Sequence, residues 1–194
     1  MVECVAYRWS PGIGDPSVFG WATVLLYVAA AALSFMRARD GFAGIDPAAS
    51  AVRWFWLGTA LLLGFLAVNK QLDLQSLFTA AGRCLAVEQG WYGQRRGLQQ
   101  GFILGLITLA VLGGAAALWM LRGALVRLWL VLTGLALLVF FVLMRASSFH
   151  HMDIFINTRL LGLKMNWIVE MGALALIIIG ALRRRPDDMR NARS

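Results

Sequence analysis

The sequence is poor in charged residues and in cysteine. Only 14% of its 194 residues are charged, whereas 60% are hydrophobic and the mean hydropathy is +0.70. Soluble domains are charged at about a quarter of their residues, so this composition excludes a water-soluble protein and is typical of an integral membrane protein. The two cysteines, Cys4 and Cys84, are too few for a disulfide framework or a cysteine-rich metal site.

Histidine is equally scarce, and this limits the cofactors that the chain could bind. The two histidines, His150 and His151, are adjacent, so they cannot ligate a haem from opposing helices. A metal site beside them would need further ligands, and the spacing of the carboxylates selects none. The sequence therefore predicts neither a cofactor nor a metal.

The net charge of +8 does not indicate nucleic acid as a partner. Most of the basic residues flank apolar runs, where they act as topology signals and contact lipid headgroups. No cleavable signal peptide is expected, because Glu3 and Asp15 precede the first apolar run and a basic start is missing. That run is therefore expected to remain as a membrane anchor.

Five apolar runs are long enough to cross a bilayer of about 30 Å as helices. They cover residues 16–36, 51–68, 101–121, 128–144 and 166–182. Residues 72–88 predict an amphipathic helix that lies on the membrane surface or caps the bundle, because their apolar residues recur at helical spacing. Residues 1–15 are expected to form a loop, residues 154–163 a second short amphipathic piece, and residues 183–194 a basic tail. The fold class is an all-α integral membrane protein with a single domain, 1–194.

Five spans place the two termini on opposite sides of the membrane. The short turn at 122–127 and the arginines at 183–185 lie close to span ends, where positive charge favours the cytoplasmic side. The sequence therefore predicts an outer N-terminus and a cytoplasmic C-terminus. Cys4 and Cys84 would then both lie on the oxidising side, where a disulfide could join them. Two unrelated buried thiols are the alternative.

Polar residues collect where four chain segments reach the predicted outer face. Solubilising the loop ends would not require Asn, Gln, His, Asp and Arg next to the spans. Three arginines of this group, Arg95, Arg96 and Arg145, could hold a phosphate or carboxylate bidentately. An anionic lipid or lipid-linked substrate is the ligand class that they favour, with a generic headgroup-binding rim as the alternative. The candidate ligand-binding residues are Lys70, Asp73, Arg95, Arg96, Gln99, Arg145, Ser148, His151 and Glu170.

Two groups in this region could have a more specific chemistry. His150 and Asp153 would share one face of a helix, so the carboxylate could fix the imidazole tautomer of a general acid or base. Helix-end hydrogen bonding is the plainer interpretation, and a serine nucleophile is disfavoured because no nucleophile elbow is present. Glu170 lies about one turn inside the fifth span and needs a partner, for which Arg145 or Lys70 is the natural candidate.

Several stretches resemble an uncharacterised family of bacterial multi-pass membrane proteins. The resemblance lies in residues 66–75 (LAVNKQLDLQ), 91–96 (WYGQRR), 145–153 (RASSFHHMD) and 166–170 (NWIVE). It implies a multi-pass protein of the bacterial inner membrane. Members of that family are often labelled isopropylmalate isomerase, but such an enzyme needs an iron–sulfur cluster held by three cysteines, and this chain has two.

Three functions follow as hypotheses, and the residues do not decide whether the protein is an enzyme. The first is an outer-face site that binds or processes an anionic lipid-like ligand among membrane lipids. The second is a non-catalytic subunit or scaffold, whose outer face docks a membrane protein partner. The third is a small transporter or channel, which is disfavoured because the first, third and fourth spans carry no buried ionisable residue to line a path.

Overall fold

The protein is an all-α membrane protein. The computed structural model describes residues 2–9, 14–40, 47–72, 74–90, 95–147, 159–160 and 163–183, and nearly all of them are helical. Within these ranges, five helices are long and apolar enough to cross a membrane. They are α2 (Val18–Asp40), α3 (Pro47–Leu72), α5 (Arg95–Met120), α6 (Leu125–Ser147) and α8 (Met165–Leu182).

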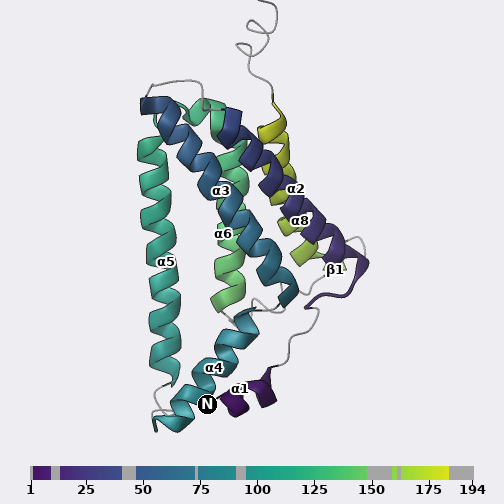
Figure 1. The fold of residues 1–194 in the computed structure, drawn as a ribbon, viewed down its shortest axis with the longest axis vertical. Coiled ribbons are helices and arrows are strands. Elements are labelled where there is room, and N and C mark those ends of the chain that lie inside the picture. Colours follow the sequence, from purple (N-terminus) through teal and green to yellow (C-terminus); the bar gives the residue numbers. More distant parts are fainter. Residues whose placement is uncertain are drawn as a thin grey trace, which may run out of the picture.

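Two further helices, α1 (Val2–Arg8) and α4 (Leu74–Glu88), lie beyond one end of the bundle (Figure 1). We call this end, where α3 and α6 finish and α2, α5 and α8 begin, the α4 end. The opposite end, where residues 121–124 join α5 to α6, is the turn end. At the α4 end, β1 (Arg159–Leu160) pairs antiparallel with β2 (Leu163–Lys164) just before α8.

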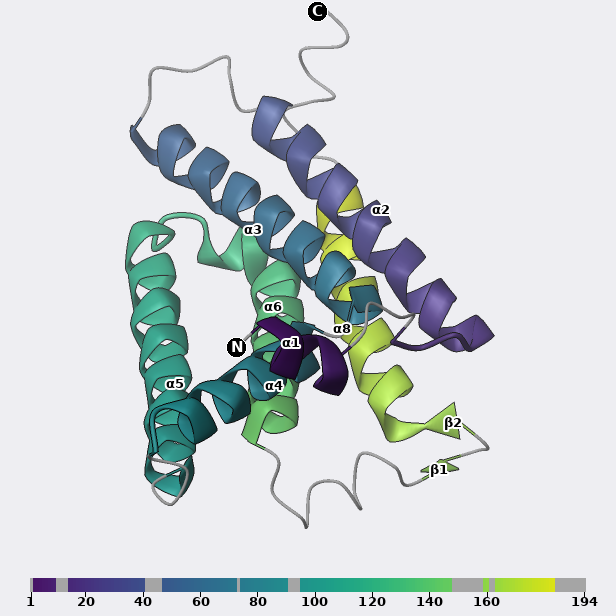
Figure 2. The same ribbon diagram turned by 60° about the horizontal axis from the view of Figure 1, so that its bottom comes forward.

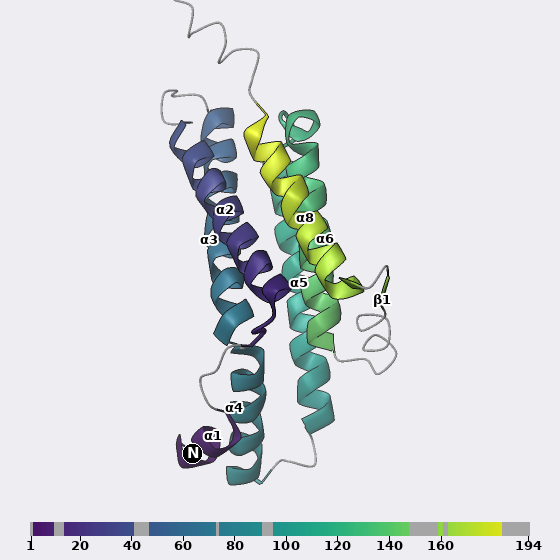
Figure 3. The same cartoon turned by 90° about the vertical axis from the view of Figure 1, so that its right-hand side faces the viewer.

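Four of the long helices form the packed part of the bundle. α2 packs against α3 and α8, and α6 packs against α8. Figure 3 shows α2 and α3 on one side and α6 and α8 on the other. All four helices contribute residues to the core. α5 stands at the edge of the bundle (Figures 1 and 2), and no residue in its apolar window is buried inside the protein. The core residues are Tyr27, Ala30, Ala38, Val52, Trp56, Leu63, Leu66, Ala67, Leu121, Leu128, Val131, Leu138, Ala173, Leu174, Ile177 and Ala181.

Glycine lets α6 and α8 approach closely. A Cβ atom at Gly134 would lie 2.7 Å from the Ala173 carbonyl oxygen and 2.8 Å from Ile177 Cγ1. A Cβ at Gly180 would likewise collide with the side chain of Val131. Small residues at such crossings are typical of membrane helices, because association there depends on close van der Waals packing and not on expelling water.

Side chains cap α2 and α8. Ser17 precedes α2, and its hydroxyl oxygen accepts a hydrogen bond from the Gly20 amide at 3.0 Å, as an N-cap residue does. At the turn end, Arg37 of α2 donates from Nε to the Ala181 carbonyl oxygen at 2.6 Å and from a terminal nitrogen to the Arg183 carbonyl oxygen at 2.9 Å. These carbonyls end α8 and lack helical partners, so Arg37 both caps α8 and fixes α2 against it.

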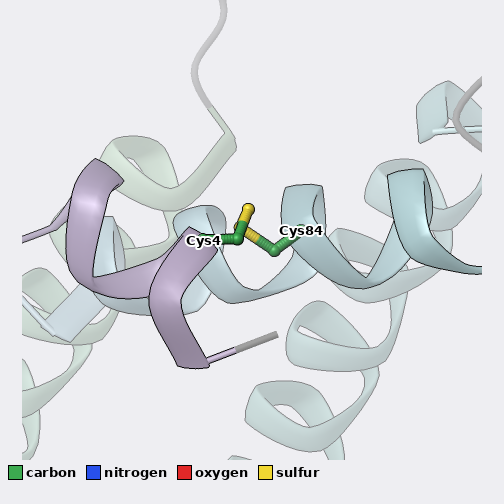
Figure 4. The surroundings of a disulfide bond; sticks show 2 residues. All are labelled: Cys4 and Cys84. Atoms are coloured by element: carbon green, nitrogen blue, oxygen red, sulfur yellow. A yellow bond between two sulfur atoms is a disulfide. The ribbon is translucent and has the colours of Figure 1, made fainter.

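A disulfide joins α1 to α4. Cys4 and Cys84 are bonded with their Cα atoms 6.0 Å apart (Figure 4), so the disulfide considered from the sequence is present, and the alternative of two unrelated thiols is wrong. Cys84 and Ala80 are buried on the same side of α4. The amphipathic helix predicted at 72–88 is therefore confirmed as α4, and part of the surface that it buries lies towards α1 and not towards lipid.

Three expectations about local structure were wrong. Residues 1–15 were expected to form a loop, but Val2–Arg8 is helical, because its cross-link and packing on α4 stabilise a segment with little helical pattern of its own. The described part of residues 154–163 includes a strand and not an amphipathic helix. Several spans extend beyond the apolar runs, and α3 continues through Asn69, Lys70 and Gln71 to Leu72, because polar residues with buried partners do not end a helix.

The disulfide predicts a specific pattern of thiol labelling. A maleimide applied to denatured protein without reductant should add no mass, because both sulfurs are bonded. After reduction two adducts are expected, and the variant Cys4→Ser should show one adduct without reductant. Mass spectrometry of the intact chain measures all three. Labelling of denatured, unreduced wild type would contradict the disulfide, since denaturation removes burial as an explanation.

Candidate functional site

A buried ion pair lies near the α4 end of the bundle. Lys70 Nζ of α3 lies 2.6 Å from Glu170 Oε2 of α8, and the two side chains are 5% and 4% exposed. Glu170 is the sixth residue of α8, about 7.5 Å along the helix from its first residue. Charges at such a depth are costly to bury unless they are paired and hydrogen-bonded, so the pair determines how α3 and α8 are aligned.

Tyr27 of α2 completes the coordination of this carboxylate. Its hydroxyl donates to Glu170 Oε1 at 2.9 Å, so each oxygen of Glu170 has a different donor. Tyr27 is 2% exposed and belongs to the core. Three helices from both sides of the bundle thus meet at one carboxylate. Both donors come from α2 and α3, which lie together on the side opposite α8 (Figure 3).

Residues 14–17 lie across the ends of α3 and α8. The Gly14 amide donates to the Gln71 carbonyl oxygen at 2.8 Å, and Trp167 Nε1 donates to Asp15 Oδ2 at 3.3 Å. The Trp167 ring also stacks on Phe19, with ring centroids 4.7 Å apart. Asp15 lies against Gly20, where any Cβ atom would collide with it. This segment therefore ties the start of α2 to both helices that carry the ion pair.

Asp15 is held in its ionised form. Partial burial raises the pKa of its carboxyl. Hydrogen bonds from the Ser17 hydroxyl at 2.6 Å, the Ser17 amide at 3.2 Å and the Trp167 indole, together with the nearby Lys70 ammonium, outweigh burial and hold the pKa below the usual 3.8. Asp15 and Lys70 thus belong to one electrostatic unit.

Two amide side chains at this end have buried polar atoms without hydrogen-bond partners among the described residues. They are Gln71, through both Nε2 and Oε1, and Asn166, through Oδ1. Gln71 follows Lys70 in α3, and Asn166 lies one turn before Glu170 in α8, so both residues adjoin the ion pair in sequence. Unpaired buried amides cost roughly 1–3 kcal/mol each, which makes a bound polar molecule or water the expected partner.

The structure brings together only some of the residues that the sequence predicted. Lys70 and Glu170 contact each other, so Lys70 and not Arg145 is the partner of Glu170. Arg145 is exposed in the last turn of α6 but interacts electrostatically with Tyr27. Arg95, Arg96 and Gln99 lie in the first turns of α5, at the same end, and their side chains are not described. Asp73, Ser148, His150, His151 and Asp153 lie outside the described residues.

Sequence reasoning missed Tyr27 and Asp15 as members of this cluster. A signal for Tyr27 existed, since it is the one tyrosine within the five spans, and a phenol in an apolar helix needs a polar partner. Asp15 was taken only as a residue preceding the first span. In the described ranges no group of three or more His, Cys, Asp or Glu side chains could hold a metal ion.

Comparison with known proteins identifies no relative. No protein-family model, no curated protein and no solved structure matches the chain. The functional argument therefore depends on the polar cluster itself.

Breaking the ion pair should destabilise the protein strongly. Lys70→Met or Glu170→Leu leaves a buried group without its partner, which is expected to lower the free energy of unfolding by about 3–5 kcal/mol. Tyr27→Phe should cost less, roughly 1.5–3 kcal/mol, because only one hydrogen bond to a charged group is lost. The double variant Lys70→Met/Glu170→Leu should recover much of the loss.

Denaturant unfolding in detergent micelles measures these changes. Arg83→Ala, an exposed change on α4, is the control and should lie within about 0.5 kcal/mol of wild type. If the two single losses simply added in the double variant, the residues would be energetically independent and the ion pair would not act as one unit.

The lowered pKa of Asp15 leads us to expect that the protein loses stability in acid. Because its folded pKa is below the unfolded value, its contribution is present above about pH 4 and is lost as the pH falls through the folded pKa. Melting temperatures of wild type and Asp15→Asn, measured from about pH 2 to 6, should differ most at the upper limit and converge in acid. A difference that does not change with pH would contradict this role.

Proposed function

We propose that the α4 end binds the headgroup of an anionic lipid-like or lipid-linked ligand. The observation that carries the proposal is a pair of amide side chains on partly exposed residues, Gln71 and Asn166. Both amide atoms of Gln71 and Oδ1 of Asn166 are buried and have no hydrogen-bond partner in the described part of the chain. Such atoms are costly in an apolar medium without a partner, so the polar groups of a ligand at this end would stabilise them. Another described atom without a partner, Ser34 Oγ, lies further along α2 and away from this end.

Arg145 is the residue best suited to bind the negative charge of this ligand. Lys70 is already neutralised by Glu170, so its charge contributes little to anion binding. Arg145 is exposed in the last turn of α6, at the same end of the bundle as the cluster. A guanidinium binds phosphate or carboxylate through two parallel hydrogen bonds. Arg95 and Arg96, in the first turn of α5, would add positive charge at the same end.

The surroundings suit a molecule with an apolar tail. Large apolar side chains are exposed along α5 near the α4 end, among them Phe102 at 62% and Leu104 at 65%. In a membrane these surfaces would face acyl chains, whereas the polar cluster lies about where headgroups begin. His150 and Asp153, which follow Arg145 in the sequence, are the candidates for acid–base chemistry on such a ligand.

We further propose that the α4 end faces the outside of a bacterial inner membrane. The Cys4–Cys84 disulfide belongs at this end, and disulfides form and persist in oxidising compartments. At the turn end, basic residues lie close to the ends of the spans, where positive charge favours the cytoplasmic side. Those described there are Arg37, Arg39, Arg53, Arg122, Arg127 and Arg183. The disulfide and the position of these arginines favour an outer N-terminus and a cytoplasmic C-terminus.

A docking subunit is the second candidate, and one observation favours it. α1 and α4 project beyond the bundle as a disulfide-linked unit (Figures 1 and 4), with Tyr7 94% and Val87 58% exposed. A membrane protein partner could bind there. A transport path is less well supported, because among the described residues the buried ions of the spans, Lys70 and Glu170, lie near one end and neutralise each other.

Arg145→Ala tests the lipid-binding proposal. We expect the dissociation constant for phosphatidylglycerol, measured by native mass spectrometry from detergent, to rise about tenfold or more, because a hydrogen-bonded charge is lost. Arg83→Ala is the matched control, since it removes the same charge from an exposed site on α4 at the same end. Equal losses in the two variants would indicate a generic headgroup rim. Unchanged lipid binding with weakened co-purification of a partner would favour the docking subunit.

A further inference from the structure

We infer that the headgroup bound at the α4 end is polyhydroxylated, such as a glycerol or sugar group carrying a phosphate. The inference depends on the proposed lipid-binding function and names the part of the ligand that the amides recognise. It follows from which polar groups of the cluster already have partners and which do not.

The charged groups of the cluster are already compensated. Glu170 accepts hydrogen bonds from Tyr27 and Lys70, and Asp15 accepts hydrogen bonds from Ser17 and Trp167. The two carboxylates therefore do not require a cationic ligand such as choline or an amine. The buried Lys70 ammonium is likewise bound to Glu170, so a phosphate would gain little by approaching it in place of Arg145.

Within the described part of the α4 end, the groups without hydrogen-bond partners are one donor and two acceptors. Gln71 offers the N–H bonds of Nε2 and the acceptor Oε1, and Asn166 offers the acceptor Oδ1. A ligand that satisfies them must both donate and accept hydrogen bonds. A fully ionised phosphate only accepts, an ammonium group only donates, and a choline group has no N–H bond to donate. A hydroxyl does both, so neighbouring hydroxyl groups match this set best.

The backbone arrangement allows one headgroup to reach these amides. The Lys70–Glu170 contact holds the end of α3 beside the start of α8, and Gln71 and Asn166 lie on these two segments. Residues 14 and 15 contact both segments as well, through the Gln71 carbonyl and the Trp167 indole. The phosphate of the ligand would then extend towards Arg145, which is exposed.

Binding of two lipids to the full-length protein in detergent tests the inference. Phosphatidylglycerol and phosphatidic acid both carry a phosphate, but only the first carries glycerol hydroxyls beyond it. We expect wild type to bind phosphatidylglycerol about tenfold more tightly than phosphatidic acid, despite the larger charge of the latter. Gln71→Leu/Asn166→Leu should remove this preference by weakening the binding of phosphatidylglycerol, whose hydroxyl groups lose their partners. Arg145→Ala should weaken both lipids alike.

The outcomes separate the two proposals. Equal binding of both lipids, each above phosphatidylcholine, would overturn the polyol inference and keep the anionic site. Binding of neither lipid above phosphatidylcholine would overturn the proposed function. Retention of the preference in the double variant would also overturn the inference, since the amides would then bind water only. Should the double variant not fold, as its melting temperature would reveal, Gln71→Met alone is expected to lose part of the preference, and full retention would overturn the inference.

A soluble competitor distinguishes the source of the headgroup. Glycerol 1-phosphate, added at the lipid concentration, should not displace phosphatidylglycerol, because it lacks the acyl chains that contact the apolar surface. Full displacement would keep the polyol chemistry but show that the ligand is a free phosphate ester, which overturns the lipid part of the proposed function.

Discussion

A carboxylate buried within an apolar helix needs hydrogen-bond donors or a cation beside it. The arrangement of this bundle depends on which groups supply them to Glu170. The cost of desolvating an ion exceeds what packing at one site can offset, so a helix carrying such a group is stable only where others supply donors. Here α3 supplies the Lys70 ammonium and α2 the Tyr27 hydroxyl. The two sides of the bundle are thereby aligned along the membrane normal at one level.

A second polar contact fixes the same helices at the opposite end. Arg37 donates hydrogen bonds to the carbonyls at the end of α8. Together with the Tyr27–Glu170 contact, this holds α2 against α8 near both ends of α8, and apolar side chains pack between the two contacts. Apolar contacts alone would allow the two helices to slide along each other, because neighbouring leucines are nearly equivalent. Two directional hydrogen-bonded contacts, one at each end, prevent this sliding. α5 lies at the edge of the bundle, and no residue in its apolar window is buried inside the protein.

The five spanning helices and the amphipathic helix could be predicted from the sequence, because a bilayer requires long apolar helices and their hydropathy and helical spacing are visible in the sequence. The residues that depend on partners were harder to predict. Glu170 clearly needed a cationic partner, but the sequence alone offered Lys70 and Arg145 as equal candidates. The choice became clear only when the structure showed which face of α3 meets α8. Tyr27 was missed because an aromatic residue in an apolar run is usually packing. α1 was missed because it depends on Cys84, eighty residues away.

The pairing of Lys70 also changes the chemistry expected of the site. From the sequence, Lys70 counted with the arginines as a cation for an anionic ligand. Once Glu170 neutralises it, the described part of the cluster contains paired charges together with amide atoms that have no hydrogen-bond partner. Selectivity at such a site comes from hydrogen-bond complementarity, because a ligand that fails to satisfy a buried amide incurs its full desolvation penalty. Charge would attract a broad class of anionic lipids to this end, and Gln71 and Asn166 would choose among them.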